Sequence, residues 1–126
     1  MPKSDRAGEL LRIYVAEEQT HRGVLLWEWL LQQASALGMQ GGSAFRAIGS
    51  FGRHHFLQEA RFFELAGSTG IEVEFIAGDE EIERLLALVR TEGIRVFYAR
   101  MPAAFGIINP DSDDPLGVSA DEQATG

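Results

Sequence analysis

The sequence predicts an α+β domain in which two helices cover one face of a four-stranded antiparallel sheet. The chain has 126 residues and 45% hydrophobic residues, which suits one compact domain with a modest core. Segments with strand-like alternation and segments with helical periodicity follow one another in the order strand, helix, strand, strand, helix, strand. Two helices can cover only one face of such a sheet, so the other face remains open.

The first half of the domain begins with a strand and a helix. Residues 11–15 alternate apolar and polar side chains and are rich in β-formers. After a polar connection, residues 24–37 have helical periodicity and end before Gly38. We expect Trp27 in the core and Trp29 on the flank, either against a neighbouring subunit or at the edge of the core. The expected core stripe of this helix is Leu26, Leu30, Ala34 and Leu37.

The second half contains two strands, a helix and a last strand. Residues 43–48 are expected to form a strand, and residues 71–76 have the clearest strand alternation in the chain. Asp79 is expected to cap a helix whose first turn is acidic and whose end is marked by Gly93. Residues 94–100 form the last expected strand. This order of elements is that of the ferredoxin-like βαββαβ fold.

The open face of the expected sheet is both charged and aromatic. Complementary charges on neighbouring strands are expected to pair across it. Its aromatic side chains favour packing against further copies of the chain, and a monomer with a solvated face is the alternative. The residues expected on this face are Arg12, Tyr14, Glu72, Glu74, Arg95 and Phe97.

Charge and composition exclude several classes of protein. The net charge is −8 and Lys3 is the only lysine, which argues against nucleic acid, an acidic membrane surface and lysine-based chemistry. The chain has no cysteine, no long apolar segment and no apolar run after its first charges, so we expect a cytoplasmic protein without membrane insertion.

We expect a flexible leader over residues 1–9, the domain over 10–102 and a disordered acidic tail over 103–126, where five acidic residues occur without a basic one.

The segment AIGSFGRHHF, residues 47–56, is the clearest candidate ligand site. Glycines let backbone N–H groups converge on an anion, and an arginine neutralises and orients it. Gly49, Ser50, Gly52 and Arg53 have this composition, and Arg46 precedes them. A plain hinge is the alternative, because two glycines three residues apart are also a common turn pattern.

Metal binding and catalysis receive less support from the sequence. His54 and His55 are adjacent, so they point apart on a strand, and no third ligand follows at a convincing spacing. A solvated pair of histidines is therefore the preferred interpretation, with metal binding kept open. Glu72 and Glu74 share a face, but pairing with arginines explains them better than a catalytic role does. We predict no catalytic residues and no enzyme activity.

The chain resembles a known family in the run LRIYV, the turn GMQGG and the segment from Arg46 to Gly52. These residues are similar to the PII-like signal-transduction superfamily, in its branch of mostly uncharacterised members. The resemblance implies a homotrimer that binds small effectors, often adenine nucleotides, in clefts between subunits. It also implies that residues 49–70 form a mobile T-loop that docks on a partner such as a membrane transporter or channel.

Two departures from the family pattern are visible. The connection Thr91-Glu92-Gly93 is short and lacks the lysine of the family's glycine-rich phosphate loop. Tyr14 and Tyr98 lie in expected strands, which excludes the tyrosine modification of the T-loop found in some members.

We therefore expect a regulatory protein that senses a small anionic effector, has no permanent cofactor and signals through a mobile loop. The alternatives are a trimer that binds a divalent metal, a dimeric enzyme of the same fold, and an adaptor subunit without a ligand. The expected ligand-binding residues are Arg46, Gly49, Ser50, Gly52 and Arg53, with Arg95 and Arg100 from the last strand.

Overall fold

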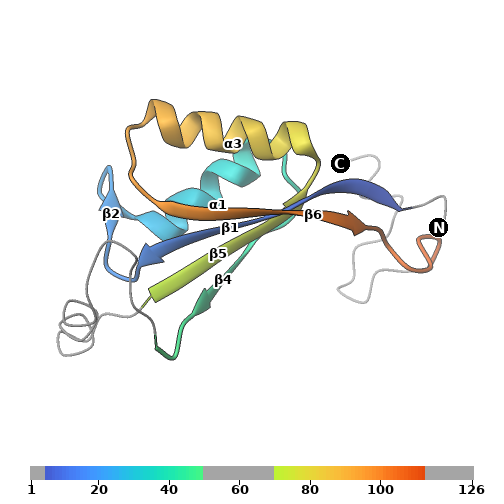
Figure 1. The fold of residues 1–126 in the computed structure, drawn as a ribbon, viewed down its shortest axis with the longest axis horizontal. Coiled ribbons are helices and arrows are strands. Elements are labelled where there is room, and N and C mark those ends of the chain that lie inside the picture. Colours follow the sequence, from blue (N-terminus) through green and yellow to red (C-terminus); the bar gives the residue numbers. More distant parts are fainter. Residues whose placement is uncertain (1–4, 50–69, 113–126) are drawn as a thin grey trace.

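A computed structural model describes residues 5–49 and 70–112 of the chain, and it has the expected architecture. Four strands form one antiparallel sheet in the order β4-β5-β1-β6, and two short strands form a separate β2-β3 hairpin. Both helices lie on the same side of the sheet (Figure 1). The predicted ferredoxin-like α+β sandwich is thereby confirmed. The elements are β1 (Arg6–Ala16), β2 (Thr20–His21), β3 (Val24–Leu25), α1 (Leu26–Ala36), β4 (Ser43–Arg46), β5 (Gly70–Ala77), α3 (Asp79–Thr91) and β6 (Phe97–Phe105).

The first and last strands are longer than the sequence pattern predicted. β1 already begins at Arg6, inside the expected leader, and β6 continues to Phe105, inside the expected tail. The two strands pair along their length, from Arg6 opposite Phe105 to Tyr14 opposite Phe97. Pro102 lies within β6, which is an edge strand, where a residue without an N–H group is tolerated.

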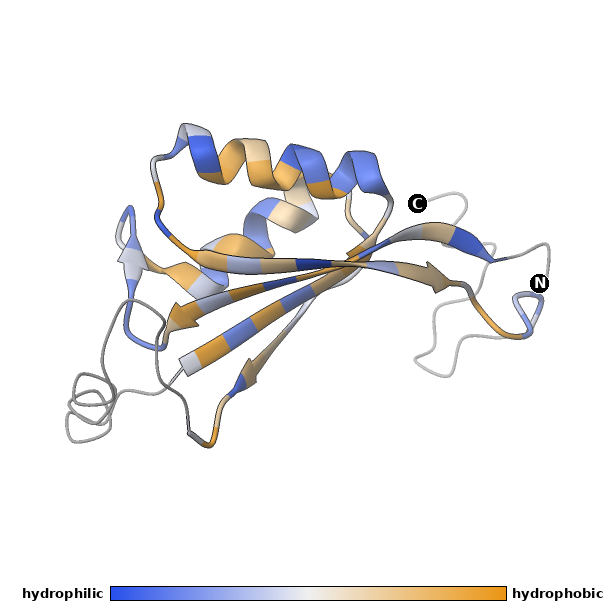
Figure 2. Cartoon of the chain, in the orientation of Figure 1, coloured by the Kyte–Doolittle hydropathy of each residue, from blue (hydrophilic) through white to orange (hydrophobic). Residues whose placement is uncertain are grey.

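The hydrophobic core lies between the helices and the sheet. Strands β1 and β5 contribute alternate side chains, and the apolar stripe of each helix faces them, as the colouring of Figure 2 shows. The fully or nearly fully buried residues include Leu11, Ile13, Val73, Phe75, Leu26, Leu30, Ile82 and Leu85.

The two tryptophans have the opposite of their expected positions. Trp29 is 6% exposed and belongs to the core, whereas Trp27 is only partly buried against it. The reason is helical spacing: Trp29 and Leu30 follow Leu26 by three and four residues, so Leu26, Trp29, Leu30 and Ala34 form the buried stripe. The prediction that Trp29 lies on the flank of the helix was therefore wrong.

The polar connection before α1 folds as a hairpin that the sequence analysis did not predict. Arg22 and Gly23 have positive φ angles of 53° and 80° and form its two-residue turn. Val24 and Leu25 pair back on Thr20 and His21, and so lie in β3 rather than in the helix. This hairpin brings His21 and Arg22 to the end of α3, where both contact Glu92.

Candidate functional site

The predicted ligand residues lie at several places in the fold. Arg46 is the last residue of β4, and Gly49 is the last described residue before the gap. Ser50, Gly52 and Arg53, with the alternative metal ligands His54 and His55, lie outside the described residues. The two arginines expected from the last strand are also separate, because Arg95 precedes β6 and Arg100 lies within it.

Arg46 is held at one edge of the sheet by a carboxylate from the end of β1. Its Nε and Nη2 atoms donate to the two carboxylate oxygens of Glu17, each over 2.9 Å. The hydrogen bonds and charge of Glu17 raise the pKa of the Arg46 guanidinium. The Arg46 side chain is nevertheless 63% exposed, so an anion can reach it from solvent.

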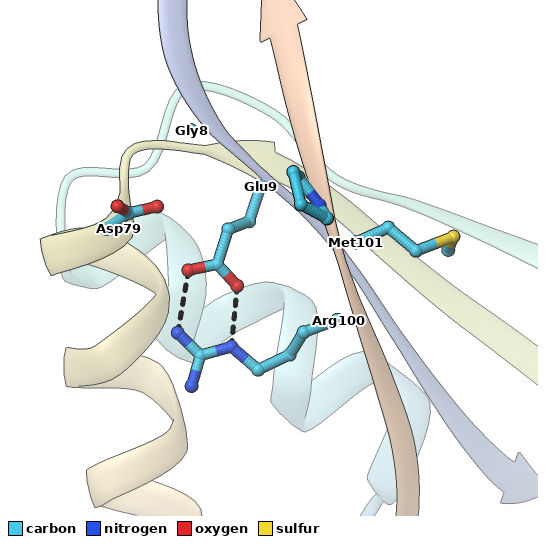
Figure 3. A pocket seen from close by; sticks show the side chains of 6 residues that line it. Gly8, Glu9, Asp79, Arg100 and Met101 are labelled. Atoms are coloured by element: carbon cyan, nitrogen blue, oxygen red, sulfur yellow. Dashed lines mark hydrogen bonds and ion pairs between the residues drawn. The ribbon is translucent and has the colours of Figure 1, made fainter.

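Arg100 lies on the other edge strand, where it pairs with Glu9 (Figure 3) and also with a second carboxylate of the same chain, Glu83. Its Nε and Nη2 atoms donate to Glu9 over 2.5 and 2.7 Å, and its Nη1 atom donates to Glu83 over 2.7 Å. The hydrogen bonds from Glu9, followed by that from Glu83, raise the pKa of Arg100. All three guanidinium nitrogens therefore already face carboxylates.

A shallow pocket of about 220 Å³ lies beside this ion pair. Hydrogen bonding to Arg100 lowers the pKa of Glu9, while hydrogen bonding to Glu9 raises the pKa of Asp79 across the pocket. With two carboxylates and one guanidinium in its lining, the pocket is acidic and does not suit an anionic effector. The lining residues are Gly8, Glu9, Asp79, Arg100, Met101 and Pro102.

The sequence analysis missed a second cluster, at the short connection that follows α3. The Nε2 atom of His21 lies 2.8 Å from Oε1 of Glu92, and Nε of Arg22 donates to the same oxygen over 2.7 Å. The His21 ring also meets Trp29 edge-on at 4.8 Å between centroids. Arg22, followed by His21, lowers the pKa of Glu92. The cluster fixes the 91–93 connection to the hairpin, and only the turn-forming pair Arg22-Gly23 gave a sequence signal for it.

The open face of the sheet has the charge pairing that the sequence predicted. Nε of Arg12 lies 2.7 Å from a Glu74 oxygen and 3.3 Å from a Glu72 oxygen, and the rings of Tyr14 and Phe97 are 5.3 Å apart. Arg95, also expected on this face, lies just before β6, which begins at Phe97. Four large apolar side chains on the face are well exposed: Phe45 (52%), Ile76 (49%), Phe97 (43%) and Met101 (39%).

Two further classes of site were sought in the described part of the chain. Residues 5–49 and 70–112 contain no group of three or more metal-ligating side chains. Neither α1 nor α3 is long and apolar enough to cross a membrane.

These features define a ferredoxin-like domain with an open, partly apolar sheet face and an exposed arginine at the edge of the sheet. Residues 8–94 match the model of the DUF190 family, described as "Uncharacterized ACR, COG1993". The chain is also 31% identical over 98 residues to a UPF0166 protein of Aquifex aeolicus (strain VF5), a match that covers 71% of this chain and 93% of the relative. The chain therefore belongs to the DUF190 family.

Two solved structures of one protein from Thiomonas intermedia K12 are also similar to this chain. The structure of CPII bound to ADP, AMP and acetate matches with 16% identity and a TM-score of 0.49, over 81% of this chain and 93% of that one. The apo form of CPII, described as a nitrogen regulatory PII-like protein, matches with 15% identity and a TM-score of 0.39, over 80% of this chain and 98% of that one.

Proposed function

We propose that this protein is a PII-like regulatory protein that senses a small anionic effector at clefts between the subunits of a homotrimer. Effector binding changes the conformation of the segment 49–70, which exposes or hides a surface for a partner such as a membrane transporter or channel. The protein acts by binding, without catalysis and without a permanent cofactor. An adenine nucleotide is the first effector to test, as the resemblance to PII-like proteins implies.

The position of two exposed arginines at one end of the sheet carries this proposal. Arg46 on β4 lies opposite Ile71 on β5, and Ile71 lies opposite Val15 on β1. Tyr14, next to Val15 on β1, lies opposite Phe97, the first residue of β6. Arg46 and the residues just before β6 are therefore at the same end, where the described chain also leaves at Gly49 and returns at Gly70 (Figure 1).

Within one chain, however, the two arginines belong to opposite edges of the sheet. Arg46 ends the edge strand β4, and Arg95 leads into the edge strand β6. Arg95 is exposed and has no ion pair or hydrogen bond among the residues that the structure describes. In a cyclic assembly one edge of each chain meets the other edge of the next, so an anion between two chains can contact both arginines.

Thermal unfolding with ATP, ADP, AMP and cyclic AMP, each with and without Mg²⁺, tests the proposal. A ligand at about 100 times its dissociation constant stabilises the folded state by about 2.7 kcal/mol, which appears as a shift of several degrees. Arg46→Ala and Arg95→Ala should each reduce the shift. Arg84→Ala is the matched control, because Arg84 is exposed on α3 and has no ion pair among the described residues.

Two outcomes would contradict this assignment. No shift with any nucleotide would exclude a nucleotide effector and favour an adaptor subunit. The effector would bind elsewhere if a nucleotide raised the unfolding temperature of Arg46→Ala and Arg95→Ala as much as that of Arg84→Ala.

A further inference from the structure

The carboxylate of Glu17 occupies the edge of Arg46 through which an arginine binds an oxyanion. An arginine binds a carboxylate or a phosphate most strongly through two parallel N–H groups on one edge of its guanidinium. In this chain Nε and Nη2 of Arg46 donate to the two oxygens of Glu17, each over 2.9 Å. Glu17 therefore holds Arg46 in the same two-pronged way as the anionic group of an effector would.

A hydrogen-bonded turn holds the backbone on both sides of Glu17. The N–H of Gln19 donates to the carbonyl oxygen of Ala16 over 3.1 Å, and the N–H of Ala16 donates to Oε1 of Gln19 over 3.3 Å. The N–H of Leu26 donates to the carbonyl oxygen of Gln19 over 2.7 Å, which ties the turn to the start of α1. Because its backbone is fixed, the Glu17 carboxylate meets Arg46 at a high effective concentration.

The ion pair is nevertheless one that an anion from solvent can open. The Arg46 side chain is 63% exposed and that of Glu17 is 31% exposed, so water can solvate both groups when they separate. An exposed pair is favoured over its separated groups by about fivefold at the upper end of the usual range, which its two-pronged geometry supports. The Glu17 carboxylate therefore restrains Arg46 without locking it.

We propose that Glu17 is a built-in competitor of the effector, so that an anionic group binds Arg46 by replacing the Glu17 carboxylate. This inference rests on the proposed function, in which Arg46 contacts the effector, and it adds the residue that sets the affinity of that contact. While Glu17 holds Arg46, only a fraction of the chains is ready to bind. Every anion therefore binds more weakly by the same factor, about fivefold.

The competition favours effectors with phosphate groups over simple carboxylates. Exchange of the Glu17 carboxylate for a carboxylate from solvent forms no stronger pair, and it replaces a tethered partner by a free one. A phosphate group has more oxygen acceptors and more negative charge, so its pair with the guanidinium is stronger than the one it replaces. We therefore expect phosphate compounds to open the ion pair and dicarboxylates such as malonate to leave it closed.

Isothermal titration calorimetry of the full chain with pyrophosphate and with ATP, in EDTA and at constant salt, tests the inference. Glu17→Gln removes the negative charge. Glu17→Asp keeps the charge but shortens the side chain by one methylene group, so the two hydrogen bonds of 2.9 Å cannot both form from the same backbone position. Both variants should bind both anions about fivefold more tightly than the natural protein does.

Glu18→Gln is the matched control. It removes the same charge from the neighbouring position, where Glu18 is exposed and has no ion pair or hydrogen bond among the residues that the structure describes. This variant should bind both anions with the affinity of the natural protein. The melting temperatures of all three variants without ligand show that each is folded before the affinities are compared.

The other outcomes separate this inference from the proposed function. If Glu17→Gln and Glu17→Asp bind the anions no more tightly than Glu18→Gln does, Glu17 does not compete, and the proposed function stands. If only Glu17→Gln binds more tightly, the charge of Glu17 acts at a distance and the exchange is wrong.

The choice of probes separates the remaining cases. If pyrophosphate follows the expected pattern and ATP binds no variant, the exchange at Arg46 is supported and the nucleotide effector is wrong. If malonate binds the natural protein as tightly as pyrophosphate does, the preference for phosphate groups is wrong. If neither pyrophosphate nor ATP binds any variant, both this inference and the nucleotide effector fail.

Discussion

Arg100 on β6 and Glu9 on β1 form a two-pronged ion pair across neighbouring strands, with hydrogen bonds of 2.5 and 2.7 Å. The third nitrogen of the guanidinium binds Glu83 on α3 over 2.7 Å. One side chain thus ties together two strands and a helix. Because its donors are occupied within the chain, we assign Arg100 a role in stabilising the fold rather than in binding the effector.

Replacing Arg100 by methionine should destabilise the fold. The Glu9 side chain is only 14% exposed and would lose its cation, next to Asp79 and Glu83. A charged group left without its partner costs about 1–3 kcal/mol, measured as a loss in the free energy of unfolding by urea. Arg84→Met is the control, and a loss no larger than that of the control would contradict the structural role of Arg100.

Stability should fall in acid because two glutamates have lowered pKa values. Arg100 lowers the pKa of Glu9 in the folded state, and Arg22 lowers that of Glu92. Each group contributes stability above its unfolded pKa of about 4.3, and this contribution is lost as the pH falls through the lower, folded pKa. We expect the free energy of unfolding to decrease below about pH 5, and Arg100→Met should reduce the part due to Glu9.

The contribution of Asp79 to stability depends on pH in the opposite way, because Glu9 raises the pKa of Asp79 in the folded state. Such a group favours the folded state at low pH, and this contribution is lost as the pH rises through its folded pKa. Asp79→Asn should therefore raise the melting temperature at pH 7 and have little effect near pH 3. A fall at pH 7 would mean that the carboxylate matters more to the start of α3 than its repulsion from Glu9.

The order of the elements was predictable because it depends on periodicity, but the strand ends were not. Alternation marks residues 11–15, whereas Arg6 to Gly8 are part of a strand only because β6 pairs with them. That pairing joins positions almost a whole chain apart. The hairpin before α1 likewise depends on the contacts of His21 and Arg22 with Glu92, about seventy residues away. Composition could suggest arginines as ligands, but only tertiary contacts distinguish Arg100 from the exposed Arg46.

Trp29 should matter more to stability than Trp27. Trp29 lies in the core against His21, whereas Trp27 is only partly buried. Truncating a buried tryptophan to alanine costs about 3–5 kcal/mol, and a half-exposed one costs less. Denaturation of Trp29→Ala and Trp27→Ala measures the difference directly. An equal or larger loss for Trp27→Ala would contradict the orientation of α1.

Two adjacent glycines before β4 provide a matched test of how that strand is positioned. A Cβ atom on Gly42 would lie 2.5 Å from the Phe75 ring and 3.1 Å from Leu31, whereas one on Gly41 would meet nothing within 4 Å. Neither glycine has a positive φ angle, so steric contact alone distinguishes the two substitutions. Phe75 is 1% exposed and cannot swing away from an added methyl group.

Gly42→Ala should therefore lower the free energy of unfolding by about 1–3 kcal/mol, the usual cost of overpacking. Gly41→Ala should stay within about 0.5 kcal/mol of the natural protein. Because β4 ends at Arg46, a shift of the strand also moves the proposed ligand arginine. Gly42→Ala should then reduce nucleotide-induced stabilisation while Gly41→Ala preserves it. If both variants unfold alike, the close approach of β4 to Phe75 does not exist in solution.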